Sequence, residues 1–216
     1  MTSEGKQPRG LAVLISGFGS NLQAIIDAIA ADELAARVNC VISDRPEARG
    51  LLRARRAGLP SRVVRPSDYG DRAAFDAALA RVIDDYGVAL IVLAGFMRIL
   101  GADFISRYEG RIINIHPSLL PKYPGLDTHR RALENADTNH GASVHFVTGE
   151  LDAGPVIIRE SLQIDKHDTE DTLRERVHRL EHRILPRAID WYLQGRLTVS
   201  GGEVLLDGRR QPDQGL

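Results

Sequence analysis

Residues 11–30 read LAVLISGFGSNLQAIIDAIA, and this stretch decides the fold. Its first five residues, LAVLI, are all apolar and predict a fully buried strand. A glycine-rich turn, SGFGSN at 16–21, comes next. The segment after the turn predicts an amphipathic helix, because apolar residues recur at spacings of three and four: Leu22, Ile25, Ile26 and Ile29. Strand, turn and helix in this order are typical of an α/β fold.

The same alternation continues through the first half of the chain. Further buried strands are predicted at 37–43, 61–64, 88–95 and 111–115, with helices near 46–57 and 71–86 between them. Strands that alternate with helices form a parallel sheet with helical crossovers. We therefore predict a Rossmann-like α/β fold, with a mostly parallel sheet and helices on both faces.

The second half has a different pattern. ASVHFV at 142–147 and PVIIRESLQI at 155–164 predict two strands joined by a tight loop, which indicates an antiparallel or mixed addition to the sheet. A long helix follows, with an apolar stripe from Leu173 to Trp191. Pro186 lies inside this stripe and predicts a kink or a restart of the helix.

The end of the chain and its length complete the outline. LTVSGGEVLL at 197–206 predicts a hairpin about its two glycines. A length of 216 residues suits one large α/β domain, so we expect a single domain over 1–216. Loose tails are expected at 1–9 and 208–216.

Composition excludes several classes of partner. The net charge of −1 provides no broad positive field for nucleic acid or an acidic membrane. The longest apolar run, at 88–97, is too short to span a bilayer. Cys40 is the only cysteine, which excludes an internal disulfide and a thiolate metal cluster and suits a reducing compartment. We therefore expect a cytoplasmic protein that acts on small molecules.

The turn at 16–21 has the properties of an anion site. Backbone N–H groups at a helix start, together with the helix dipole, favour phosphate. Leu22 occupies the position of the third glycine in a dinucleotide-binding fingerprint, and no Gly-Lys-Ser/Thr sequence follows, so a single phosphomonoester fits better. The alternative is a capping box between Ser20 and Gln23, with glycines that serve only the turn.

Asn114 and His116 lie at the carboxyl end of a predicted strand. Side chains alternate along a strand, so both project from the same side and could grip one carbonyl oxygen. Ligands of open α/β sheets collect outside these strand ends, where the loops after residues 15, 95 and 115 should meet. The loop at 117–125 contains three prolines and is expected to shape the site. The alternative for His116 is a buried structural histidine.

Asp152 lies in the sequence LDAGP at 151–155, where formation of a turn is the simplest explanation for an aspartate. If Asp152 reaches His116, it would orient the imidazole ring, stabilise the imidazolium and help to relay protons. This pairing is a hypothesis.

Two charged clusters have simpler interpretations than their motifs suggest. HRLEH at 178–182 matches the H-x-x-E-H pattern of zinc enzymes, but a solvated helix face with one substrate contact explains it better. The cluster Arg53, Arg55 and Arg56 is also expected to be a solvated helix face, not a nucleic-acid site.

Five stretches, in this order and spacing, closely resemble the glycinamide ribonucleotide formyltransferases over nearly the whole chain: SGFGSNLQAIIDA, VLAGFMRIL, NIHPSLLPKYPG, SVHFVTGELDAGP and the part of the last helix that includes Glu181 and His182. The Asn/His/Asp trio marks the superfamily of formyltransferases that use formyltetrahydrofolate. The resemblance implies transfer of a formyl group from 10-formyltetrahydrofolate to the amine of 5'-phosphoribosylglycinamide (GAR) in de novo purine biosynthesis, with no metal.

The resemblance also implies roles for particular residues. The implied catalytic trio is Asn114, His116 and Asp152. The implied GAR contacts are Gly19, Ser20, Asn21, His178, Arg179, Leu180 and Glu181. The implied folate contacts are Arg72, Met97, Arg98, Ile99, Leu100, Asn114, Thr148, Gly149, Glu150, Leu151 and Asp152.

Two residues depart from the usual family pattern: Phe18, where the turn often carries Asn, and Asp127, where the segment after KYPG often carries His. Neither belongs to the trio. A formyltetrahydrofolate hydrolase with the same trio and a non-catalytic nucleotide-binding module remain as alternatives. A transferase that acts on initiator tRNA is disfavoured, because no basic surface is indicated. A monomer and a homodimer are both compatible with the sequence.

Overall fold

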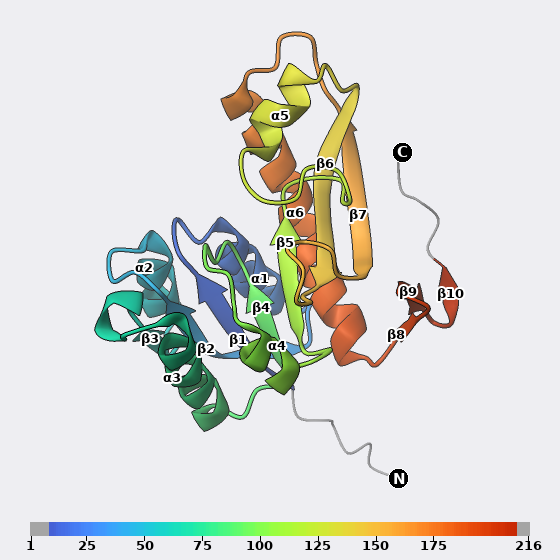
Figure 1. The fold of residues 1–216 in the computed structure, drawn as a ribbon. Coiled ribbons are helices and arrows are strands. Elements are labelled where there is room, and N and C mark those ends of the chain that lie inside the picture. The colour runs from blue at the N-terminus through green and yellow to red at the C-terminus, as the bar shows by residue number, and fades with distance from the viewer. Residues whose placement is uncertain (1–8, 211–216) are drawn as a thin grey trace.

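The computed structural model of the chain describes residues 9–210. Its centre is a seven-stranded sheet with the strand order β3-β2-β1-β4-β5-β6-β7 (Figure 1). The first five strands in the chain are parallel, and β6 and β7 are antiparallel to their neighbours. The strands are β1 (Arg9–Ile15), β2 (Ala36–Ser43), β3 (Ser61–Val63), β4 (Leu90–Leu93), β5 (Ile112–His116), β6 (Asn139–Phe146) and β7 (Val156–Gln163). The predicted mostly parallel sheet with a mixed addition is confirmed.

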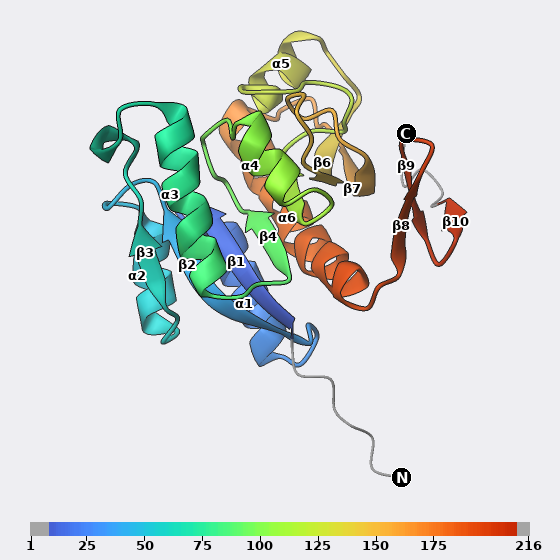
Figure 2. The same ribbon diagram turned by 60° about the horizontal axis from the view of Figure 1, so that its bottom comes forward.

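Helices cover both faces of the sheet, as predicted (Figures 1 and 2). Alternate residues of β1 belong to two separate cores: Leu11 packs with residues of α1 and α6, while Leu14 packs with residues of α3 and α4. The helices are α1 (Ser20–Ala30), α2 (Arg49–Arg56), α3 (Arg72–Asp85), α4 (Ala102–Arg107), α5 (Thr128–Glu134) and α6 (Glu170–Leu193), with a 3-10 turn η1 (Pro66–Asp68).

Three helices differ from the sequence-based expectations. The short helices α4 and α5 were not predicted, because six or seven residues show too little periodicity to identify a helix. Of the two alternatives expected at Pro186, a kink or a restart, the restart is wrong, since α6 continues through the proline. Ile184, Leu185 and Ala188 are fully buried around the proline, and this packing outweighs the loss of one backbone hydrogen bond.

The C-terminal hairpin is present about Gly201 and Gly202, and it is extended to three strands: β8 (Leu197–Ser200), β9 (Glu203–Leu206) and β10 (Arg209–Arg210). The expected tails therefore differ at their inner ends, because residue 9 begins β1 and residues 209–210 pair with β9. The remainder of both tails, 1–8 and 211–216, lies outside the described residues. Within 9–210, no helix combines the length and the apolarity needed to cross a membrane.

The carboxyl ends of the central strands meet at one edge of the sheet, as predicted. The loop after β1 joins the loop after β4, because Ser16 N–H donates to the Gly95 carbonyl at 3.0 Å and Met97 N–H donates to Ser16 Oγ at 2.8 Å. The antiparallel register of β5 and β6 places Asn114 opposite His145. This edge therefore gathers polar side chains from several strands.

A glycine on β6 tests how closely this part of the sheet is packed. A Cβ atom at Gly141 would lie 2.1 Å from the Glu160 carbonyl oxygen of β7 and 2.8 Å from Leu119 Cδ2. We therefore expect Gly141→Ala to lower the free energy of unfolding by about 2 kcal/mol, as overpacking does. Urea denaturation measures this. Gly70→Ala is the control, because no atom lies within 4 Å of its added Cβ; equal effects of the two substitutions would contradict the packing described.

Candidate active site

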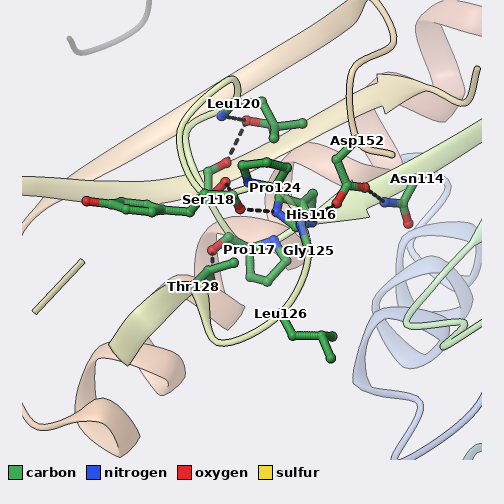
Figure 3. Close-up of polar contacts among 12 residues, drawn as sticks. Asn114, His116, Pro117, Ser118, Leu120, Pro124, Gly125, Leu126, Thr128 and Asp152 are labelled. Carbon is green, nitrogen blue, oxygen red and sulfur yellow. Dashed lines mark hydrogen bonds and ion pairs between the residues drawn. The ribbon is translucent and has the colours of Figure 1, made fainter. Parts of the chain in front are cut away.

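The carboxylate of Asp152 is the centre of the polar cluster at the sheet edge (Figure 3). Its Oδ2 accepts a hydrogen bond from Gly125 N–H at 2.8 Å and lies 3.4 Å from His116 Nδ1. Its Oδ1 accepts from Asn114 Nδ2 at 3.4 Å. The structure therefore brings Asn114, His116 and Asp152 together, and the expected contact between Asp152 and His116 is present.

The His116 ring is buried and faces an oxygen on each side. Its Nε2 lies 2.8 Å from the Tyr123 carbonyl, opposite the Asp152 contact of Nδ1. Both oxygens are satisfied only when both ring nitrogens carry hydrogen, as in the imidazolium. Burial lowers the pKa of His116, and the Tyr123 carbonyl and the Asp152 carboxylate oppose that shift. The ring is therefore held in place by both oxygens, while its burial favours the neutral form.

Asp152 itself stays ionised more readily than a free aspartic acid. Burial alone would raise its pKa, but the nearby His145 ring, the hydrogen bond from Gly125 N–H and the nearby His116 ring together lower it. Asp152 also has a left-handed backbone, with φ of 51°. The loop geometry and the hydrogen bonds thus present a carboxylate to His116.

His145 is a site residue that sequence reasoning missed. Its Nε2 lies 3.1 Å from Asn114 Nδ2 and 3.6 Å from Asp152 Oδ1, while its Nδ1 lies 2.9 Å from the Phe146 carbonyl. A ring with its hydrogen on Nδ1 can donate to Phe146 and accept from Asn114. The available signal was a histidine in a strand expected to join the same sheet, but only the register places it opposite Asn114.

The three-proline loop after β5 is held by short hydrogen bonds, one within the loop and others from β6 and α5. Ser118 Oγ donates to the Lys122 carbonyl at 2.5 Å, and Ser143 Oγ donates to the Ser118 carbonyl at 2.7 Å. Thr128 Oγ1 donates to the Pro117 carbonyl at 2.7 Å. These contacts fix the Tyr123 carbonyl beside His116 and Gly125 N–H beside Asp152, so the loop shapes the site as predicted.

A cleft of about 710 Å³ opens next to the trio. Four large apolar side chains that line the cleft are exposed: Met97, Ile99, Leu126 and Leu151. A group of exposed apolar side chains marks a binding surface. Arg45 and Arg174 also line the cleft, as does Arg98, which donates to Asp44 Oδ2 at 2.7 Å. The cleft thus has an apolar wall, a polar floor and cationic groups.

The residues expected to contact folate fall into two groups. Met97, Arg98, Ile99, Asn114, Leu151 and Asp152 line the cleft, and Leu100 is buried beside it. Arg72 lines a separate groove with residues of α3 and α4, and Thr148, Gly149 and Glu150 are not among the lining residues of the cleft. Asp127, one of the two departures, also lines the cleft and carries a left-handed backbone at the start of α5.

The capping-box alternative for the glycine-rich turn is wrong. Helix α1 begins at Ser20 after Gly19, which has φ of 75°, and no side chain caps it. Gln23 instead donates to Asp27 Oδ1 at 2.8 Å and accepts from Arg53 at 3.2 Å. The expectation of a solvated Arg53 is also wrong, since this half-buried side chain contacts the turn. The first N–H groups of α1 are therefore left for a ligand.

Asn21 and Glu181 form a buried pair between α1 and α6. Asn21 Nδ2 donates to Glu181 Oε2 at 2.8 Å, and the two residues are 8% and 4% exposed. Burial raises the pKa of Glu181 to about 7, against the hydrogen bond from Asn21. The expected solvated face at 178–182 is therefore wrong for Leu180 and Glu181, because both pack inward, while Arg179 is exposed.

Other histidines form two further pairs. The rings of His178 and His182 stack at 6.3 Å between centroids, one turn apart on α6. His129 and His140 are buried with 3.1 Å between Nδ1 and Nε2, and burial lowers their pKa values to about 3 and about 4. Among residues 9–210, no group of three His, Cys, Asp or Glu side chains is arranged to hold a metal ion.

The formyl transferase family model matches residues 9–189. The chain belongs to the formyl transferase family. It is 51% identical over 205 residues to a phosphoribosylglycinamide formyltransferase of Escherichia coli, covering 95% of this chain and 97% of that relative. A glycinamide ribonucleotide transformylase from Symbiobacterium toebii has the same fold, with a TM-score of 0.93 at 44% identity over 95% of this chain and 97% of its own.

The formyl transferase fold is shared with a third protein of a different name. A formyltetrahydrofolate deformylase from Pseudomonas syringae superimposes with a TM-score of 0.84 at 26% identity. The match covers 93% of this chain and 66% of that one. The fold alone therefore does not decide between these activities.

The buried carboxyl of Glu181 makes a testable contribution to stability. The folded protein keeps this group protonated up to about pH 7, whereas the ordinary pKa is 4.5. Between these pH values Glu181 ionises in the unfolded wild type but stays protonated in the folded protein, so its contribution to the free energy of unfolding falls as the pH rises. The Glu181→Gln variant lacks this contribution. The stability of Glu181→Gln relative to wild type should therefore rise by about 3 kcal/mol between pH 4.5 and pH 8.

Urea denaturation across this pH range measures that difference. Glu175→Gln, which alters an exposed glutamate of the same helix, is the matched control. A difference between Glu181→Gln and wild type that does not change with pH would show that Glu181 is not desolvated as described.

Proposed function

We propose that this chain transfers the formyl group of 10-formyltetrahydrofolate to the amine of GAR, giving formyl-GAR and tetrahydrofolate. The observation that carries the proposal is the network in which one carboxylate, Asp152, contacts both Asn114 and His116. The uncapped start of α1 offers a separate place for the phosphate. The names and high identity of the family members described above support it.

The cleft suits a folate as formyl donor. An exposed apolar wall of Met97, Ile99 and Leu151 offers contact area for a flat heteroaromatic ring. Arg98 and Arg174 can meet the carboxylates of the folate tail. We assign Leu100, which is buried next to Ile99 in the sequence, to the same site. The family resemblance also assigns Arg72 and the segment Thr148, Gly149 and Glu150 to the donor, although these residues do not line the cleft.

The other end of the site suits GAR. Phosphate would accept from the free N–H groups at Gly19, Ser20 and Asn21, where no side chain competes. His178, Arg179, Leu180 and Glu181 of α6 would meet the ribose and the glycinamide part. Glu181 is the acidic group of this segment that can accept a hydrogen bond from an amine or a hydroxyl group. Its Oε2 is held by Asn21, which fixes the position of the carboxyl group.

The chemistry needs donors for a developing oxyanion and a path for the amine's protons. Bound folate supplies an activated formyl carbon. In the structure, both hydrogens of the Asn114 amide are engaged, one with His145 at 3.1 Å and one with Asp152 at 3.4 Å. The longer contact is the one that an oxyanion would replace. Contacts of this kind are often long in free enzymes and tighten with substrate.

His116 would act as the second donor and as the proton carrier. Its contact with Asp152 is 3.4 Å, so a small displacement lets Nδ1–H reach a substrate oxygen while Nε2–H stays on Tyr123. The ionised Asp152 stabilises the imidazolium and, with a water molecule, can take a proton from the attacking amine. The bond from the formyl carbon to the folate nitrogen then breaks, and that nitrogen takes up one proton as tetrahydrofolate leaves. These side chains supply the donors and proton carriers without a metal ion.

The proposed reaction belongs to purine biosynthesis in the cytoplasm, with small-molecule substrates and no nucleic acid. The proposal is compatible with a monomer and with a homodimer. Hydrolysis of formyltetrahydrofolate is the second candidate, favoured by the structural match to the deformylase. An occupied phosphate turn would have no role in that reaction.

Release of tetrahydrofolate tests the proposal. Purified protein should release it from 10-formyltetrahydrofolate only when GAR is present. His116→Ala should lower kcat/KM at least about 10²-fold to 10³-fold, since a positioned acid or base contributes about that much. Release without GAR would establish the hydrolase instead, and release in neither condition would leave a binding module.

A further inference from the structure

Helix α2 packs directly on the glycine-rich turn. A Cβ atom at Gly19 would lie 2.6 Å from Gly50 Cα, and Gly50 N–H donates to the Gly17 carbonyl at 3.0 Å. Glycine is therefore required on both sides of this contact, and the left-handed backbone of Gly19 adds to the requirement at that position. Helix α2, which lies outside residues 16–21, thus holds the turn in place.

Arg53 extends this contact from α2 to both sides of the turn. Its Nε donates to the Phe18 carbonyl at 3.0 Å, just before Gly19, and its Nη1 donates to Gln23 Oε1 at 3.2 Å, in the first turn of α1. One rigid guanidinium therefore bridges the strand side and the helix side of the turn. A lysine could not make both contacts, because its ammonium has no fork geometry.

Phe18 holds this guanidinium in place. The centre of its ring lies 4.6 Å from Arg53 Cζ, in a cation–π contact, and the ring is 56% exposed. Arg49 Cζ lies 5.9 Å from the same ring. None of the ion pairs found within residues 9–210 involves Arg53. A half-buried cation without a carboxylate partner thus stands beside an uncapped helix start.

Two observations in the neighbourhood point to a ligand. The amide oxygen of Asn21, a residue that is 8% exposed, has no hydrogen-bond partner, so a donor is missing at the start of α1. A groove lies next to the turn, lined by Ser20, Arg53 and, on α6, His182, whose pKa is lowered by burial and by the charges of His178 and Arg53. Arg53 thus lines an open groove together with the first residue of α1.

We infer that Arg53, held by Phe18, is a positioning residue that shapes the phosphate turn and supplies the positive charge for the acceptor's phosphate. This inference rests on the proposed function and adds to it a residue from α2. A phosphate dianion at the N–H groups of Gly19 and Ser20 would be stabilised by a fixed cation nearby. Arg53 would not first have to break an ion pair with a carboxylate. Phe18, which departs from the usual family residue, provides the surface that fixes it.

The test compares Arg53→Gln, Arg53→Lys and the control Arg56→Gln, an exposed arginine of the same helix. Arg53→Gln should raise the KM for GAR about tenfold to a hundredfold, the worth of a charge-assisted contact. Its kcat and its KM for 10-formyltetrahydrofolate should stay within about twofold of wild type. Arg53→Lys should recover part of the loss, because it keeps the charge without the fork.

A nucleoside form of GAR that lacks the phosphate separates charge recognition from general damage. Wild type and Arg53→Gln should use it with the same KM. An equal loss with the nucleoside, or the same loss in Arg56→Gln, would overturn the inference.

Calorimetric titration with ribose 5-phosphate gives a readout that does not depend on formyl transfer. Binding should weaken about tenfold or more in Arg53→Gln and stay unchanged in Arg56→Gln. This result in a protein without transferase activity would refute the proposed function and leave the phosphate role of Arg53 standing. Unchanged binding in Arg53→Gln would refute that role even if the transferase is active.

Discussion

The rest of the site depends on the carboxylate of Asp152, because it is the point where three separate segments meet. Asn114 and His116 come from the end of β5, Gly125 from the three-proline loop, and Asp152 from the loop between β6 and β7. Without this carboxylate, the buried imidazole of His116 would face only the Tyr123 carbonyl. An ionised group held by backbone and side-chain donors is thus what sets the orientation and the protonation of the trio.

The two ends of the site are built on different principles. Around Asp152, the groups are polar, their contacts are long enough to exchange with substrate, and the pKa values of His116 and Asp152 are both shifted. Around Gly19, the backbone is fixed by close packing against Gly50, and the helix start is left without a cap. A fixed anion site at one end and exchangeable donors at the other suit a reaction in which one substrate part is only held while another part reacts.

Much of the fold could be predicted from the sequence, since apolar runs identify the strands and their alternation with helices predicts a mostly parallel sheet. The order of the strands comes from the structure. Asn114 and His116 were placed correctly because side chains alternate along a strand. The contribution of His145 depends on the register between β5 and β6, which local sequence does not encode. The burial of Glu181 and the contact of Arg53 with the turn depend on how α6 and α2 pack. The charged residues of these helices were therefore predicted to face solvent, whereas the structure buries Glu181 and brings Arg53 against the turn.

If Asp152 acts through His116, the two residues form one unit, and their combined loss must be smaller than the sum of their separate losses. The direct measurement is a double-mutant cycle on kcat with GAR and 10-formyltetrahydrofolate, using His116→Ala, Asp152→Ala and the double variant. The account predicts that the double variant is about as slow as the slower single variant. Losses that simply multiply, with each substitution costing the same in the presence or absence of the other, would show that the contact between Asp152 and His116 is not what organises the site.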